Sequence, residues 1–210
     1  GLYSGNGDAS GTVNLVRKRP TAERQIKFAA YAGSWNNYRA ELDVGGPLNA
    51  SGTLRARVVA GWQDADAYFT GEYTKDKFGY GIVEWDVGAR TTLSAGLSYD
   101  DLNAQKYERT LAWRSGSLGT PENLPILSKR ESWMPEWAYD KAQTLQYFAK
   151  VSHDFSADWN LTVNVTRNEV DSDELYGYYG IGINSDAATP SGFFMRWMSR
   201  GFANQTMAHA

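Results

Sequence analysis

The sequence contains no cysteine among its 210 residues, and it contains only 6 prolines and 2 histidines. The absence of cysteine excludes a disulfide scaffold, a cysteine-ligated zinc or iron–sulfur site and a thiol nucleophile. No run of about 18 apolar residues is present, and the mean hydropathy is -0.52, so the sequence predicts no membrane-spanning helix. The net charge of -3 is too small and too evenly mixed to indicate a nucleic-acid partner.

Aromatic residues and glycines are abundant: the chain has 8 Trp, 13 Tyr and 21 Gly. This composition favours an all-β protein with long loops. Six segments alternate between apolar and polar residues with a period of two, at 39–44, 53–63, 80–87, 92–99, 145–155 and 160–166. Such segments predict strands, and a repeat of roughly 9–11 residues suits tilted strands that cross a bilayer.

The predicted connections alternate in length. Short turns are expected at 45–52, 88–91 and 156–159, and longer loops near 64–75, 103–141 and 175–192. Short turns at one end and long loops at the other are typical of bacterial outer-membrane barrels. A soluble sandwich would show turn signals every ~8–12 residues without this asymmetry.

Charged residues share one face of the predicted strands. A hairpin register centred near residue 49 places Asp43 opposite Arg55, and a second register places Glu84 opposite Arg57. We expect carboxylates to flank both arginines on a polar lumen wall; the alternative is an ordinary solvated sheet face. Aromatic residues at the strand ends predict two interfacial girdles, with core packing as the alternative: Trp85, Phe155 and Trp159 at the short turns, and Trp35, Trp62 and Tyr99 at the other end.

Residues 5–21, GNGDASGTVNLVRKRPT, closely resemble the end of the plug domain of TonB-dependent siderophore receptors. In that family a glycine-rich loop leads into a strand that exits to the barrel. Further similarity lies at 32–35, at 41–48 and between Trp137 and Trp159. The sequence looks most like receptors for ferric hydroxamate or pyoverdine-type siderophores. It lacks, at 113–121, the W-G-G-L-P run of many relatives, which leaves the ligand's identity open.

The resemblance implies an all-β fold, an antiparallel transmembrane β-barrel fragment from a plugged barrel of about 22 strands. Residues 1–20 would be the C-terminal end of the plug. Residues 21–210 would be the N-terminal part of the barrel, with seven strands and a truncated eighth that begins near Trp197. We expect this piece not to insert alone, because an open sheet edge is costly in lipid.

The implied function is the binding of a ferric siderophore outside a Gram-negative cell for TonB-energised uptake through the outer membrane. The expected partners are the ferric siderophore, TonB (through a region missing here), and outer-membrane lipid and lipopolysaccharide, but no nucleic acid. No enzyme activity and no cofactor are expected, because the iron arrives as a chelate. The alternatives are haem or cobalamin as ligand, or a complete small barrel that acts as an adhesin or a structural porin-like protein.

Aromatic and basic residues of the two longest loops, with Tyr3 before the glycine-rich loop, are the candidate ligand contacts. Aromatic side chains bury the flat face of a chelate, and Arg and Tyr donate hydrogen bonds to its anionic oxygens. The alternative is that these residues only pack the loops together. The candidates are Tyr3, Trp113, Arg114, Trp133, Trp137, Tyr139, Tyr176, Tyr178 and Tyr179.

No catalytic or metal site is predicted. The glycine-rich segment 4–11 lacks the Gly-Lys-Ser/Thr ending of a phosphate-binding loop. His153 has no second histidine at ligand spacing, and the acidic segment 168–174 lacks the glycine turn of a calcium loop. No nucleophile–base pair is indicated.

Overall fold

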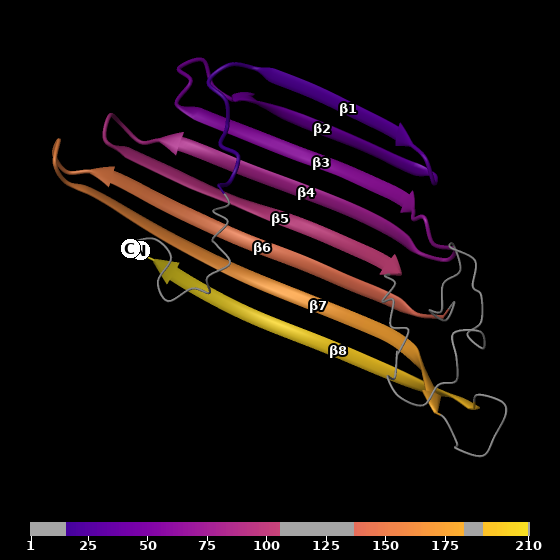
Figure 1. The fold of residues 1–210 in the computed structure, drawn as a ribbon. Helices are drawn as coiled ribbons and strands as arrows, with labels where there is room; N and C mark the ends of the chain where they lie inside the picture. Colours follow the sequence, from indigo (N-terminus) through magenta and orange to yellow (C-terminus); the bar gives the residue numbers. More distant parts are fainter. Residues whose placement is uncertain (1–15, 106–136, 183–190, 210) are drawn as a thin grey trace.

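The computed structural model describes residues 16–105, 137–182 and 191–209, and these form one antiparallel sheet in which each strand pairs with the next (Figure 1). The prediction of an all-β, antiparallel fold is therefore confirmed. No helix that could cross a membrane occurs in these described ranges. The strands are β1 (Gln25–Gly33), β2 (Asn37–Pro47), β3 (Leu54–Asp66), β4 (Tyr73–Asp86), β5 (Thr91–Gln105), β6 (Tyr139–Asp154), β7 (Asn160–Gly182) and β8 (Ser191–His209).

The connections follow the predicted asymmetry only in part, because at the long-loop end β1–β2 and β3–β4 are also joined by short turns, at 34–36 and 67–72. Short turns join β2 to β3, β4 to β5 and β6 to β7 at one end, and β5 and β6 are separated by 33 residues (106–138) at the other. The loop predicted at 64–75 is too long, because β3 continues to Asp66 and β4 begins at Tyr73, and Lys75 pairs with Asp64 at 3.5 Å. The loop predicted at 175–192 is also too long, because β7 continues to Gly182. In both places the apolar alternation ends before the strand does.

Alternating side chains give the sheet two different faces. Leu42, Val58 and Val83 are exposed on what we call the outer face. Their neighbours Asp43 and Glu84 are buried on the inner face, over which the segment before β1 lies. An apolar face that stays exposed while charged side chains are buried is the reverse of a soluble protein, and it fits lipid outside and a polar lumen inside.

The edge of the apolar area on the outer face runs diagonally across the strands. On the outer face the continuous apolar run ends at Trp62 in β3, before Asp64, and at Val165 in β7, before Arg167. Val165 of β7 lies in the same pairing row as Ala56 of β3, four strands away. Ala56 is six residues closer to the short turns than Trp62. At about 3.3 Å per residue and about 4.8 Å between strands, the edge moves about 20 Å along the strand direction over a distance of about 19 Å across the sheet. A horizontal bilayer surface then requires a strand tilt of about 45°, the value of transmembrane strands.

Aromatic side chains lie at both ends of the strands and are exposed, in the positions that the sequence predicts. Trp85, Phe155 and Trp159 lie beside the short turns, and Trp62 and Tyr99 lie toward the opposite end. Trp35 occupies the β1–β2 turn with a left-handed backbone (φ 58°), which is rare for a bulky residue. Its carbonyl accepts a hydrogen bond from the Asp66 N–H at 2.9 Å, so the strained turn is fixed against β3.

Candidate functional site

The candidate site is the inner face of β2–β6 together with residues 16–24, which we call the crossing segment. This segment runs across the strands before the chain enters β1 at Gln25 (Figure 1). The strand that the resemblance implies is not found at 16–21, which have no regular structure. Pro20 lacks an N–H group and cannot donate a hydrogen bond to a strand ladder. The segment is instead held by side chains: Arg17, Lys18 and Arg19 reach the sheet.

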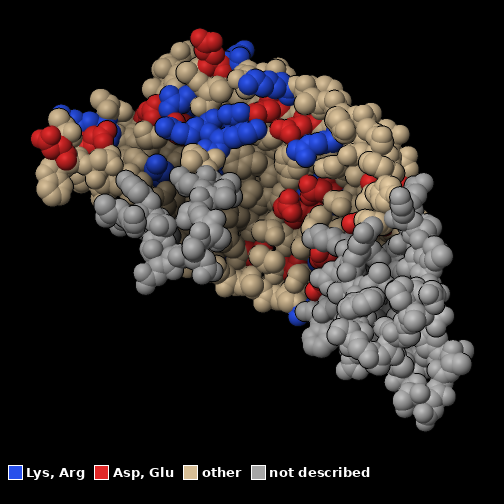
Figure 2. Space-filling view, viewed as in Figure 1, with Lys and Arg blue, Asp and Glu red and all other residues tan. Residues whose placement is uncertain are grey.

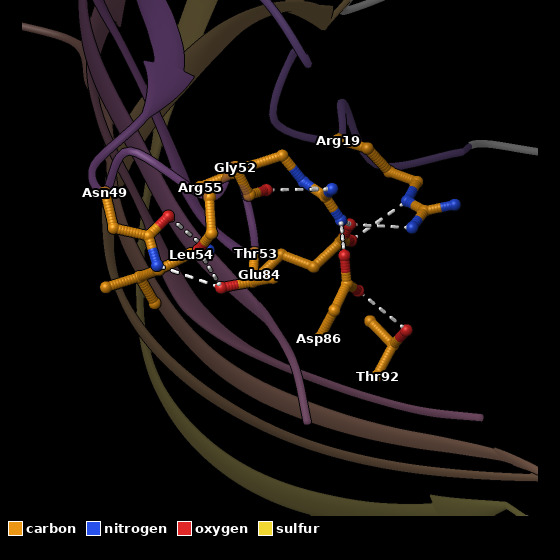
Figure 3. Close-up of polar contacts among 10 residues, drawn as sticks. Arg19, Asn49, Gly52, Thr53, Leu54, Arg55, Glu84, Asp86 and Thr92 are labelled. Carbon is orange, nitrogen blue, oxygen red and sulfur yellow. Dashed lines mark hydrogen bonds and ion pairs between the residues drawn. The ribbon is translucent and has the colours of Figure 1, made fainter. Parts of the chain in front are cut away.

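Arg19 joins the crossing segment to a chain of ion pairs on β3 and β4 (Figure 3). Its Nε and Nη2 donate to the two carboxylate oxygens of Glu84 at 3.0 and 2.7 Å. Arg55 Nη2 donates to the same carboxylate at 2.8 Å and lies 2.8 Å from Asp86. Glu84 is almost fully buried, whereas 69% of the Arg19 side chain is exposed. The hydrogen bonds to the Glu84 carboxylate raise the pKa of Arg19 further above its usual value, and the guanidinium is charged in either case.

Asp43 of β2 is the second anchor for the crossing segment. Arg57 makes a bidentate contact with Asp43 at 2.8 and 2.7 Å, and Lys18 Nζ donates to the same carboxylate at 3.3 Å. Two hydrogen bonds hold the segment's backbone: Arg57 Nη1 donates to the Arg19 carbonyl at 2.9 Å, and the Tyr80 hydroxyl donates to the Lys18 carbonyl at 2.7 Å. Val59 lies between Asp43 and Tyr80 in the same pairing row, beneath Lys18.

The two predicted registers are wrong in detail. Asp43 lies opposite Val59 rather than Arg55, and Glu84 lies opposite Arg55 rather than Arg57. The first slip is four residues, because the β2–β3 hairpin is centred at Ser51, with Gly52 at φ +69°, rather than near residue 49. The second is two residues, because the β3–β4 connection is centred between residues 69 and 70 rather than between 70 and 71. An even slip keeps every side chain on its face, so both arginines still meet carboxylates. Each meets them from one side only, however: Arg55 contacts Glu84 and Asp86 of β4, and Arg57 contacts Asp43 of β2.

Among the described residues, Arg17 contacts no carboxylate. Its Nη2 donates to Gln146 at 2.7 Å, and its guanidinium lies 4.4 Å from the centre of the Phe148 ring. Phe148 stacks on Tyr80 with ring centres 6.0 Å apart. The Phe148 ring also covers Gly96 of the neighbouring strand, where a Cβ would come within 2.5 Å of the ring. A side chain at residue 96 would therefore displace the surface on which Arg17 rests.

The whole arrangement is a charged surface on which the crossing segment docks. Figure 2 shows the basic side chains as a band across this face, with acidic side chains beside it. The part of the chain that the structure describes contains no group of three or more residues that could hold a metal ion. Sequence reasoning missed the crossing segment as a site. The available signal was the basic run 17–19 immediately before a proline, upstream of strands that carry acids on one face.

The predicted ligand-contact residues are placed only in part. Tyr3, Trp113, Arg114 and Trp133 lie outside the described residues. Trp137 is exposed just before β6, and Tyr139 is the first residue of β6, where its hydroxyl donates to Asp173 at 3.2 Å. The prediction of a loop around Tyr176, Tyr178 and Tyr179 is wrong, because their backbone pairs in β7 with β8. Trp137, Tyr139 and Tyr176 do share the long-loop end of the sheet, since Tyr139 pairs with Leu175.

Comparison with known proteins finds ferric-pyoverdine receptors. The chain is 31% identical over 188 residues to the ferric-pyoverdine BN7/BN8 receptor of Pseudomonas putida, covering 90% of this chain and 23% of that receptor. It is 36% identical over 162 residues to the ferripyoverdine receptor of Pseudomonas aeruginosa, covering 76% of this chain and 19% of the receptor. The chain thus spans about a fifth of the length of these relatives. No protein-family model matches it.

Solved structures agree on the fold. The ferripyoverdine receptor of the outer membrane of Pseudomonas aeruginosa, bound to ferripyoverdine, superposes with a TM-score of 0.78 at 27% identity, over 97% of this chain and 27% of the receptor. The ferric-catecholate import receptor of E. coli superposes with a TM-score of 0.75, over 94% of this chain and 30% of the receptor. At 16% identity, that second likeness shows the fold alone.

Proposed function

The chain is homologous to the TonB-dependent siderophore receptors of the outer membrane, and we propose that it supplies the end of the plug and the first barrel strands of such a receptor. The proposed boundary places residues 1–20 in the plug and 21–210 in the barrel wall, with the first strand at Gln25. One observation carries the proposal: a basic segment is pinned by ion pairs to the polar face of a sheet whose other face is apolar and exposed. A plug domain attached to a barrel wall is expected to show such a contact between its last residues and the polar face of the sheet.

The proposed activity is binding and gated passage, with no chemistry on the ligand. A ferric siderophore binds outside the cell, and TonB, acting through a region outside this chain, displaces the plug so that the chelate passes. The iron stays in its chelate, so the protein needs no metal ligands of its own. The names of the relatives favour a pyoverdine-type siderophore.

The ligand is proposed to bind at the long-loop end. The candidate contacts remain Tyr3, Trp113, Arg114, Trp133, Trp137, Tyr139, Tyr176, Tyr178 and Tyr179. The exposed ring of Trp137 and the position of Tyr139 at the start of β6 support this placement. The alternative of a complete eight-stranded barrel is not favoured, because β1 and β8 lie at opposite edges of the described sheet and pair only with β2 and β7.

The test is ferric-siderophore binding to the complete receptor, produced in a Gram-negative strain that lacks its own siderophore receptors. A Trp133→Ala, Trp137→Ala double variant is expected to bind ferric pyoverdine at least tenfold more weakly, since each aromatic contact contributes about 1 kcal/mol or more. The matched control is Trp159→Ala, at the short-turn end and exposed, which should bind normally. A receptor that binds and imports no ferric siderophore would refute the proposed function.

A further inference from the structure

A cavity of about 630 Å³ lies on the inner face, on the short-turn side of the crossing segment. The crossing segment closes one side of the cavity, and β4–β7 form its floor. The residues that matter here are Arg17, Arg19, Glu84, Ser94, Lys150 and Asn164. The cavity lies closer to the short turns than the ligand site proposed at the long-loop end. A ligand that enters from the long-loop end therefore reaches the cavity second.

Two cations of this cavity differ from the others around them. On the inner face of β3–β7 and in residues 17–19, Arg19, Lys18, Arg55 and Arg57 each contact a carboxylate. Within the same described residues, Arg17 contacts Gln146 and Phe148 but no carboxylate, and Lys150 has no carboxylate partner. Both line this one cavity.

The rest of the lining does not neutralise these charges. Glu84 is the only acid among the described lining residues, and its carboxylate already accepts hydrogen bonds from Arg19 and Arg55. Lys150 lies in the pairing row between Ser94 and Asn164, so its neighbours offer a hydroxyl and an amide rather than a negative charge. A cavity with spare positive charge and neutral donors suits an anionic, oxygen-rich ligand.

We propose that this cavity is a second binding station inside the barrel, where Lys150 and Arg17 bind the anionic oxygen groups of the ferric chelate after it leaves the loop-end site. This inference rests on the proposed function. The chelate reaches the station while the crossing segment, with Arg17, is still docked and the rest of the plug has moved, because the crossing segment closes only one side of the cavity. Its contribution is to the rate of passage and not to the affinity measured at the cell surface.

The test separates surface binding from uptake in the complete receptor, using ferric pyoverdine labelled with radioactive iron. Lys150→Glu is expected to slow energised uptake at least tenfold and Lys150→Gln severalfold. Lys150→Arg, which keeps the positive charge, should take up the chelate at the wild-type rate. Binding to de-energised cells should stay within twofold of wild type for all three variants. The matched control is Lys77→Glu, because Lys77 is exposed on the outer face in the pairing row of Trp62 and Asp101; its uptake should be unchanged.

Three outcomes overturn the station. Normal uptake by Lys150→Glu would show that the chelate does not meet this lysine. Equal loss of binding and uptake would place Lys150 in the surface site. A lowered melting temperature of Lys150→Gln would show that the lysine serves an internal ion pair. Failure of the proposed function is distinguishable, because the wild-type receptor itself would then bind no ferric siderophore.

Discussion

Glu84→Gln is the sharpest test of the contact between the crossing segment and the barrel wall. The change removes the negative charge that Arg19 contacts at 2.7 and 3.0 Å, whereas Arg55 retains Asp86 at 2.8 Å. Because 69% of the Arg19 side chain is exposed, solvent screens the pair. A bidentate, largely exposed pair contributes about 1–2 kcal/mol to docking. The open fraction of the segment should then rise about 5- to 30-fold, at 1.4 kcal/mol per factor of ten.

The assay is thiol labelling of a Val59→Cys variant of the complete receptor in detergent. Val59 is 3% exposed and lies beneath Lys18, so a reagent reaches the thiol only when the segment lifts. Glu84→Gln in this background should label about 5- to 30-fold faster. The matched control is Glu169→Gln, which breaks an ion pair of similar length, 2.8 Å to Arg167, on the outer face. Equal labelling rates in the Glu84→Gln variant and its parent would refute the docking role of this ion pair.

Two further substitutions test the wall itself, both read as the melting temperature of the complete receptor in detergent. Asp43→Asn leaves the largely buried Arg57 without its charged partner and should cost about 3 kcal/mol; an unchanged melting temperature would contradict the role of Asp43. Val83→Arg places a charge on the lipid-facing side and should cost about 2–4 kcal/mol, whereas Ser94→Arg, at similar depth on the inner face, should cost far less. Equal losses in the two arginine variants would contradict the assignment of the faces.

The two faces of the sheet could be predicted from the sequence because a period of two survives errors of register. Asp43 and Arg57 were predicted to share a face, and they do, although the hairpin register is off by four residues. The register could not be fixed because three glycines, Gly45, Gly46 and Gly52, flank this turn, and any of them permits a tight reversal. The turn centre, and with it each opposed pair, depends on which glycine takes the left-handed conformation.

The limits of the strands and the crossing segment were harder to predict, for different reasons. Beyond the bilayer both faces of a strand are polar, so Asp64 and Tyr176 lie in strands whose alternation is no longer apolar against polar. The crossing segment has no periodicity at all. Its contacts join residues far apart in the chain, such as Arg19 and Glu84, 65 residues apart, and no local pattern reports such a pair.

The ion pairs of the inner face are of two kinds that share the same carboxylates. Arg55 and Arg57, which are 19% and 13% exposed, belong to the wall; Lys18 and Arg19, which are 51% and 69% exposed, belong to the crossing segment. When the segment leaves, Glu84 keeps Arg55 and Asp43 keeps Arg57, so no buried carboxylate loses its last partner. A buried charge left alone costs several kcal/mol, and the wall arginines remove that cost. The segment's own pairs are exposed and weaken with salt, so its contact with the wall is the part of the network suited to reversible release.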